Sequence, residues 1–86
     1  MENQQTIECL IELISILSHN LNKGFYQFKF KGDNSITFKS FESLDSPSLF
    51  KDLKDAISLW NSLSSDSELK VNFHLNPKDR EITLTW

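Results

Sequence analysis

Apolar residues recur every three or four positions in the first quarter of the chain, between Gln5 and Asn22. This spacing places side chains along one stripe of an α-helix. The stripe consists of Ile7, Leu10, Ile11, Ile14, Leu17 and Leu21. Lys23-Gly24 follows, and glycine readily adopts the left-handed conformation that often ends a helix. We therefore predict a helix that ends at this glycine.

Two short segments of alternating apolar and polar residues come next, residues 26–30 and 36–38. Alternation with a period of two is typical of β-strands that have one buried face. The segment between them contains Gly32-Asp33-Asn34, residues that favour a tight turn. The pattern predicts a β-hairpin.

The second half of the chain repeats this order of elements. Asp45-Ser46-Pro47 predicts a helix start, because serine can cap the first turn and proline suits the first helical position. Apolar residues then recur at helical spacing, at Leu49, Phe50, Leu53, Ala56, Ile57, Trp60 and Leu63. Residues 69–75 and 82–86 alternate again around Asn76-Pro77-Lys78-Asp79, which predicts a second hairpin.

The order α-β-β-α-β-β predicts an α+β fold, because each helix and each hairpin has one apolar face to cover. A two-layer sandwich meets that need, with a four-stranded antiparallel sheet and both helices on one face. Ile14-Ser15-Ile16 resembles Ile57-Ser58-Leu59, and Ile36-Thr37-Phe38 resembles Ile82-Thr83-Leu84. These matches indicate an αββ pseudo-repeat, about 5–41 and 47–86, that arises either from duplication or from shared patterning alone.

Composition places the chain in one class. Its 86 residues fit a single domain, 1–86, and its net charge of −3 does not favour nucleic acid or an anionic membrane as a partner of the whole surface. One cysteine excludes an internal disulfide, and the acidic residues near the start do not suit a secretory signal. No apolar run is long enough for a membrane span. We expect a small acidic cytoplasmic protein of bacterial type that does not contact a membrane.

The residues that usually carry catalysis do not converge in the sequence. The only thiol and imidazole groups are Cys9, His19 and His74, without the close spacing of zinc ligands. Neither glycine belongs to a phosphate-binding loop. Glu8 and Glu12 stand one helical turn apart, which is more typical of a solvated face than of paired acid and base. We therefore expect no catalytic residue, no metal, no cofactor and no enzymatic activity.

The first candidate surface is the open face of the sheet. If Tyr26, Phe28 and Phe30 face the helices, strand alternation directs a set of basic residues and one aromatic ring outward. These residues are Lys29, Lys31, Lys39, Phe41, Lys70 and His74. Such a face can hold a phosphate backbone with a base on the ring, or an acidic protein. The alternative is that the lysines only keep the sheet from pairing with other chains.

The second candidate surface is a second apolar strip on the first helix, formed by Cys9, Leu13 and Ile16 beside Glu8 and Glu12. It either packs against the second helix or contacts a partner protein or a second copy.

Binding is therefore the function that the sequence favours. By analogy of size and charge, we expect a module that inhibits another protein, as immunity proteins and antitoxins inhibit basic toxins. In this hypothesis Glu8 and Glu12 attract a basic partner, while Leu13 and Ile16 form the apolar centre. The alternatives are binding of single-stranded nucleic acid through the lysine face, and a homodimeric structural subunit.

Overall fold

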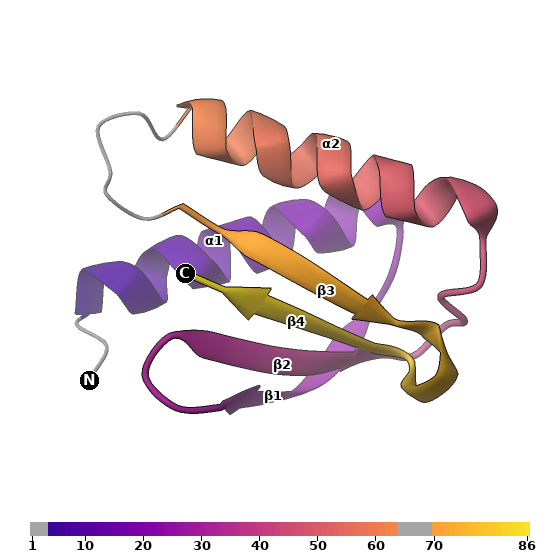
Figure 1. The fold of residues 1–86 in the computed structure, drawn as a ribbon, viewed down its shortest axis with the longest axis horizontal. Coiled ribbons are helices and arrows are strands. Elements are labelled where there is room, and N and C mark those ends of the chain that lie inside the picture. Colours follow the sequence, from indigo (N-terminus) through magenta and orange to yellow (C-terminus); the bar gives the residue numbers. More distant parts are fainter. Residues whose placement is uncertain (1–3, 64–69) are drawn as a thin grey trace.

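In the part of the chain that the structure describes, two α-helices and four β-strands follow one another in the predicted order α-β-β-α-β-β (Figure 1). The structure is a computed structural model, and it describes residues 4–63 and 70–86. The elements are α1 (Gln4–Leu21), β1 (Phe25–Phe30), β2 (Ser35–Ser40), α2 (Pro47–Leu63), β3 (Asn72–Asn76), the 3-10 turn η1 (Pro77–Asp79) and β4 (Glu81–Thr85). The two hairpins and the start of the second helix at Pro47 are confirmed. Residues 64–69, which include the first residue of the predicted strand 69–75, lie outside the described residues.

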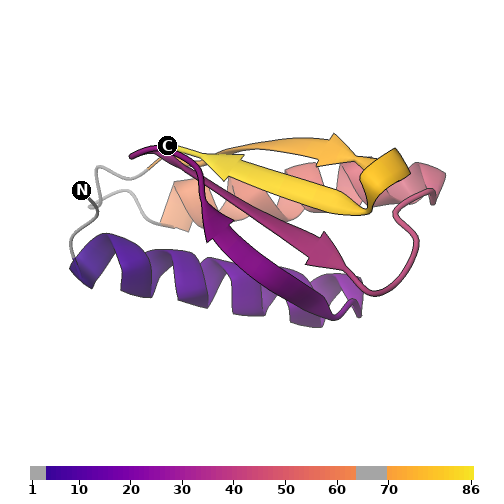
Figure 2. The same ribbon diagram turned by 90° about the horizontal axis from the view of Figure 1, so that it is seen from below.

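The four strands form one antiparallel sheet in the order β1-β2-β4-β3. The central strands are β2 and β4, and β1 and β3 form the edges. Both helices lie against the same face of this sheet (Figures 1 and 2). The predicted two-layer α+β architecture is therefore confirmed, and the opposite face of the sheet is open in the part of the chain that the structure describes.

The core lies between the helices and the sheet, but α1 is rotated relative to the prediction. Leu13 is 0% exposed, whereas Ile11 is 59% exposed. The buried stripe of α1 is thus turned by about 50° toward Leu13 at the ideal helical twist. α1 is also in contact with α2, and we attribute the burial of Leu13 to that contact. Among the described residues, the buried apolar side chains that form the core are those of Leu10, Leu13, Ile14, Leu17, Ile36, Phe38, Leu44, Leu49, Leu53, Ile57, Val71, Ile82 and Leu84.

The end of α1 also differs from the prediction. Asn22 adopts the left-handed conformation with φ 54°, and its N–H donates to the carbonyl of His19 at 3.3 Å. The N–H of Lys23 donates to the carbonyl of Ser18 at 3.1 Å, which completes a Schellman motif. Gly24 has a different role. A Cβ at this position would lie 3.0 Å from Cδ2 of Phe41, so glycine permits the close approach of that ring.

A bulge in β1 breaks the predicted alternation of this strand. Tyr26 pairs with Lys39 and Lys29 pairs with Thr37, which leaves one extra residue on β1. Gln27 has φ 57° within this irregular segment. The extra residue places Tyr26 on the open face of the sheet, beside Lys39, while Phe28 and Phe30 face the helix side. The predicted inward orientation of Tyr26 is therefore wrong.

One asparagine fixes the start of β3 to the end of α2. Nδ2 of Asn61 donates to the carbonyl of Val71 at 3.0 Å, and Oδ1 accepts from the N–H of Val71 at 3.0 Å. Val71 is buried in the core. The side chain of Asn61 therefore replaces a neighbouring strand for both backbone groups of this buried residue.

Candidate functional site

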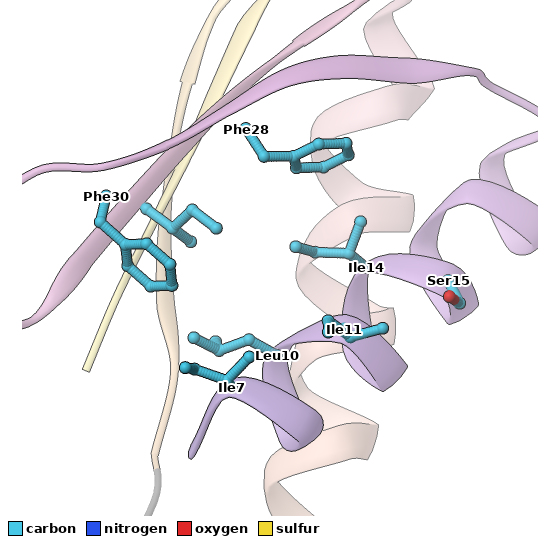
Figure 3. A pocket seen from close by; sticks show the side chains of 8 residues that line it. Ile7, Leu10, Ile11, Ile14, Ser15, Phe28 and Phe30 are labelled. Carbon is cyan, nitrogen blue, oxygen red and sulfur yellow. The ribbon is translucent and has the colours of Figure 1, made fainter. Parts of the chain in front are cut away.

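An apolar groove lies between α1 and the edge strand β1. Figure 3 shows Phe28 and Phe30 projecting from β1 toward α1, with Ile11 and Ile14 opposite them. The cavity measures about 360 Å³. It is lined by Ile7, Leu10, Ile11, Ile14, Ser15, Phe28, Phe30 and Ile36. We call this feature the α1–β1 groove.

Three large apolar side chains in the groove are about half exposed. Ile11 is 59%, Phe28 49% and Phe30 44% exposed. Each phenylalanine has an aromatic neighbour on its buried side, Phe38 at 5.4 Å between ring centroids for Phe28 and Trp86 at 6.4 Å for Phe30. Their positions are thus set by packing, while their outer surfaces remain in contact with solvent. Exposed apolar clusters are typical of interaction sites, so this cluster makes the groove a candidate site.

The groove continues toward the C-terminal end of α1. A second hollow of about 300 Å³ shares Ile14, Ser15 and Phe28 with it and adds Ser18 and Phe25. The hydroxyl of Ser18 donates to the carbonyl of Lys23 at 2.6 Å, so it belongs to the helix end. The whole feature is an elongated channel, apolar at the N-terminal end of α1 and more polar at the other.

At the corresponding place in the second half of the chain, the described residues are packed differently. Phe30 pairs with Ile36 as Leu75 pairs with Ile82, so Phe28 and Phe30 correspond to Phe73 and Leu75. Both Phe73 and Leu75 are partly buried against the core. Phe50 of α2 covers Phe73, with their ring centroids 5.3 Å apart.

A smaller side chain on α1 accounts for this difference between the halves. When Ile14 is aligned with Ile57, the residue of α1 that corresponds to Phe50 is Ile7. Ile7 lines the groove without filling it. The side chain at position 7 therefore leaves Phe28 uncovered, where Phe50 of α2 packs against Phe73.

Acidic residues border the groove on α1. Glu8 and Glu12 are exposed and lie about 60° and about 100° around the helix axis from Ile11. They adjoin the groove on the side away from α2. Two carboxylates therefore lie on the helix surface beside the residues that line the groove.

The strip predicted to form the centre of a partner surface lies elsewhere. Leu13 is in the core, and Cys9 and Ile16 are half-buried. Because α1 packs against α2, this side of the helix serves the contact between the two helices. Leu13 is thus not on the surface that the sequence analysis assigned to a partner, whereas Glu8 and Glu12 are exposed as expected.

The open face of the sheet brings together most of its predicted residues. Lys29, Lys31 and Phe41 are exposed, and Lys39 is half-buried. Together with Gln27, Thr37 and Glu81, the three lysines line a hollow of about 100 Å³. His74 is exposed on β3 and pairs in register with Thr83.

Lys70 does not belong to this face. It precedes β3, and its Nζ donates to the carbonyl of Asn61 at the end of α2, at 3.0 Å. Its ammonium group is therefore held by the helix layer.

The described residues contain no group of three or more His, Cys, Asp or Glu that could hold a metal ion. Within residues 4–63 and 70–86, neither helix has the length and apolar character needed to cross a membrane. Comparison with family models, with curated proteins and with solved structures gave no match for this chain. Functional inference therefore depends on the two surfaces themselves.

Sequence reasoning missed the α1–β1 groove because it assigned Ile11, Phe28 and Phe30 to the core. One signal was available. Apolar residues on the first helix cover more of its circumference than one buried stripe requires, since Leu13 and Ile16 add a second strip beside the first. When a neighbouring helix covers one of two apolar strips, part of the other strip remains exposed to solvent.

Proposed function

We propose that this chain is a small protein-binding module that inhibits a partner protein by covering its functional surface through the α1–β1 groove. The observation that carries the proposal is the cluster of Ile11, Phe28 and Phe30, each about half exposed around one cavity. The partner contributes apolar side chains that fill the groove and basic side chains that pair with Glu8 and Glu12.

The apolar part of this contact supplies affinity. Complete burial of a large apolar side chain contributes about 1.5–3 kcal/mol, so covering the exposed half of each of these three contributes about 1 kcal/mol. The groove is also formed in the free protein, so less conformational entropy is lost on binding. A few buried anchors of this kind commonly dominate the affinity of an interface.

The charged part of the contact selects the partner. The whole chain carries a net charge of −3, and Glu8 and Glu12 lie at the rim of the groove. Complementary charge accelerates association with a basic protein and disfavours acidic ones. A second copy of this chain carries the same net charge, so a basic partner is favoured over self-association.

Two matched variants test the proposal. Ile11 of the groove and Leu59 of α2 are both helical and both 59% exposed. Ile11→Asp places a charge in the groove, whereas Leu59→Asp places the same charge outside it. We expect both variants to fold, which circular dichroism checks, and only Ile11→Asp to lose the partner.

The experiment uses immobilised wild-type protein and both variants in native lysate from the source cells. The supporting result is a basic protein that the wild type and Leu59→Asp retain and that Ile11→Asp does not. Once purified, this basic protein should lose its activity when an equimolar amount of the wild-type chain is added. Equal retention by both variants contradicts a groove interface. Retention without loss of the captured protein's activity contradicts inhibition.

A further inference from the structure

The open face of the first hairpin combines positive charge with exposed aromatic surface, on the opposite side of β1 from the groove. Lys29 and Lys31 are two positions apart in extended chain, which places their Cα atoms about 7 Å apart. Lys39 lies diagonally across from Lys29 on β2, because Lys29 pairs with Thr37. Three of the nine basic residues of an acidic chain therefore gather on one small area.

The hollow between these lysines has a polar floor. Thr37 is 4% exposed, and its Oγ1 lies 3.1 Å from Oγ1 of Thr83. Gln27 projects to the same hollow because of the bulge in β1. One carboxylate is present at the edge, that of Glu81, which pairs in register with Lys39. Three ammonium groups against one carboxylate leave the hollow positive and therefore suited to an anion.

A two-ring platform adjoins this basic hollow. The rings of Tyr26 and Phe41 are stacked, with centroids 4.4 Å apart and an angle of 25° between their planes. Phe41 is 63% exposed. The ring of Phe41 packs against Tyr26 and against Gly24, which has no side chain to block its approach. The backbone N–H of Phe41 also donates to the carbonyl of Gly24 at 3.0 Å. The ring position is fixed although most of its surface is open.

We infer that this face binds single-stranded nucleic acid, with phosphates on Lys29, Lys31 and Lys39 and one base stacked on Phe41. Fixed aromatic rings beside a track of positive charge are the combination that holds single strands without sequence preference. A duplex does not fit equally well, because its bases are already stacked on each other. The site is independent of the groove, so either proposal can fail without the other.

Phosphate contacts of this kind make the binding affinity depend on salt concentration. Each phosphate contact on a single strand adds about −0.7 to the slope of log affinity against log salt concentration, so three contacts give a slope of about −2. Affinity should then fall about 16-fold between 50 and 200 mM salt. Fluorescence anisotropy of a labelled oligothymidylate of twelve nucleotides measures this directly.

Paired lysine variants locate the contacts. Lys29→Gln/Lys31→Gln removes two phosphate contacts and should bring the slope to about −0.7. Lys51→Gln/Lys54→Gln removes the same charge from exposed positions of α2 and should leave the slope unchanged. Phe41→Leu keeps an apolar side chain but removes the ring face, and should weaken binding about fivefold or more.

Several results would overturn the inference. They are no binding at 50 mM salt, an equal loss of affinity in both double lysine variants, full affinity in Phe41→Leu, and a duplex of the same length that binds as tightly as the single strand. Competition by polyglutamate at the same charge concentration, as effective as unlabelled oligothymidylate, would assign the face to an acidic protein instead. Circular dichroism of each variant separates lost binding from lost folding.

Discussion

Thr37 and Thr83 lie opposite each other on the two central strands, with their Oγ1 atoms 3.1 Å apart. They occupy equivalent positions in the two αββ segments, 5–41 and 47–86. Around them Ile36 pairs with Leu84 and Phe38 with Ile82, so the pairing of β2 with β4 is symmetric about the two threonines. The two hairpins are therefore placed alike, and the open groove in one half reflects a local difference in side chains. Duplication and shared αββ patterning alone remain the two explanations of this likeness.

The threonine pair is expected to contribute to stability as a unit. Thr37→Val or Thr83→Val alone leaves one partly buried hydroxyl without its partner and should cost about 1 kcal/mol. The double variant should cost less than the sum of the two, with a coupling of about 0.5–1.5 kcal/mol. Urea unfolding of the four proteins measures this coupling. Strictly additive losses would show that the hydroxyls do not interact.

Asn61 is expected to be the polar side chain on which the attachment of β3 most depends. Asn61→Ala removes both hydrogen bonds to the backbone of the buried Val71 and should lower the free energy of unfolding by about 2–4 kcal/mol. Asn20→Ala is the control, because Asn20 is exposed on α1. The midpoint of urea unfolding compares the two. A shift no larger than that of the control would mean that solvent replaces both hydrogen bonds.

Phe38 and Phe28 should differ in their contribution to stability although both face the helix side of the sheet. Phe38 is 0% exposed, and Phe38→Ala should cost about 3–5 kcal/mol, most of the stability of so small a domain. Phe28→Ala removes a half-exposed ring and should cost about 1–2 kcal/mol. Thermal unfolding followed by circular dichroism distinguishes them. Equal losses would place Phe28 in the core and would argue against an open groove.

Ile7→Phe is expected to close the groove. The variant gives α1 the side chain that α2 carries at Phe50, so the new ring should cover Phe28 as Phe50 covers Phe73. We expect unfolding to require about 0.5–1 kcal/mol more free energy and partner binding to weaken at least tenfold. Calorimetric unfolding and a binding titration with the captured partner test both effects. Unchanged partner affinity at higher stability would separate the groove from binding.

The order and type of the two α-helices and four β-strands could be predicted from the sequence, because apolar periodicity specifies them directly. Three details could not. The bulge at Gln27 reverses the orientation of Tyr26, and no residue type in this segment predicts a bulge. The left-handed end of α1 falls on Asn22, and the glycine at position 24 instead permits the close approach of Phe41. The rotation of α1, which buries Leu13 and exposes Ile11, depends on where α2 packs.

The two candidate surfaces differ in how far they could be predicted from the sequence. The lysines of the open face follow from strand alternation within one hairpin, which is local. The α1–β1 groove depends on the distance between a helix and an edge strand, and on the size of Ile7 relative to Phe50. Such relations appear only when the elements are placed in space.

Isoleucine methyl groups offer the most direct test that the groove is the binding site. Of the seven isoleucines in the chain, Ile7, Ile11, Ile14 and Ile36 line the groove, whereas Ile16, Ile57 and Ile82 do not. Spectra of protein labelled at these methyl groups, recorded with and without the captured partner, report each position separately. We expect the largest changes at Ile7 and Ile11, smaller changes at Ile14 and Ile36, and unchanged signals at Ile57 and Ile82. Changes confined to Ile16, or unchanged signals at Ile7 and Ile11 in a saturated complex, would contradict the account.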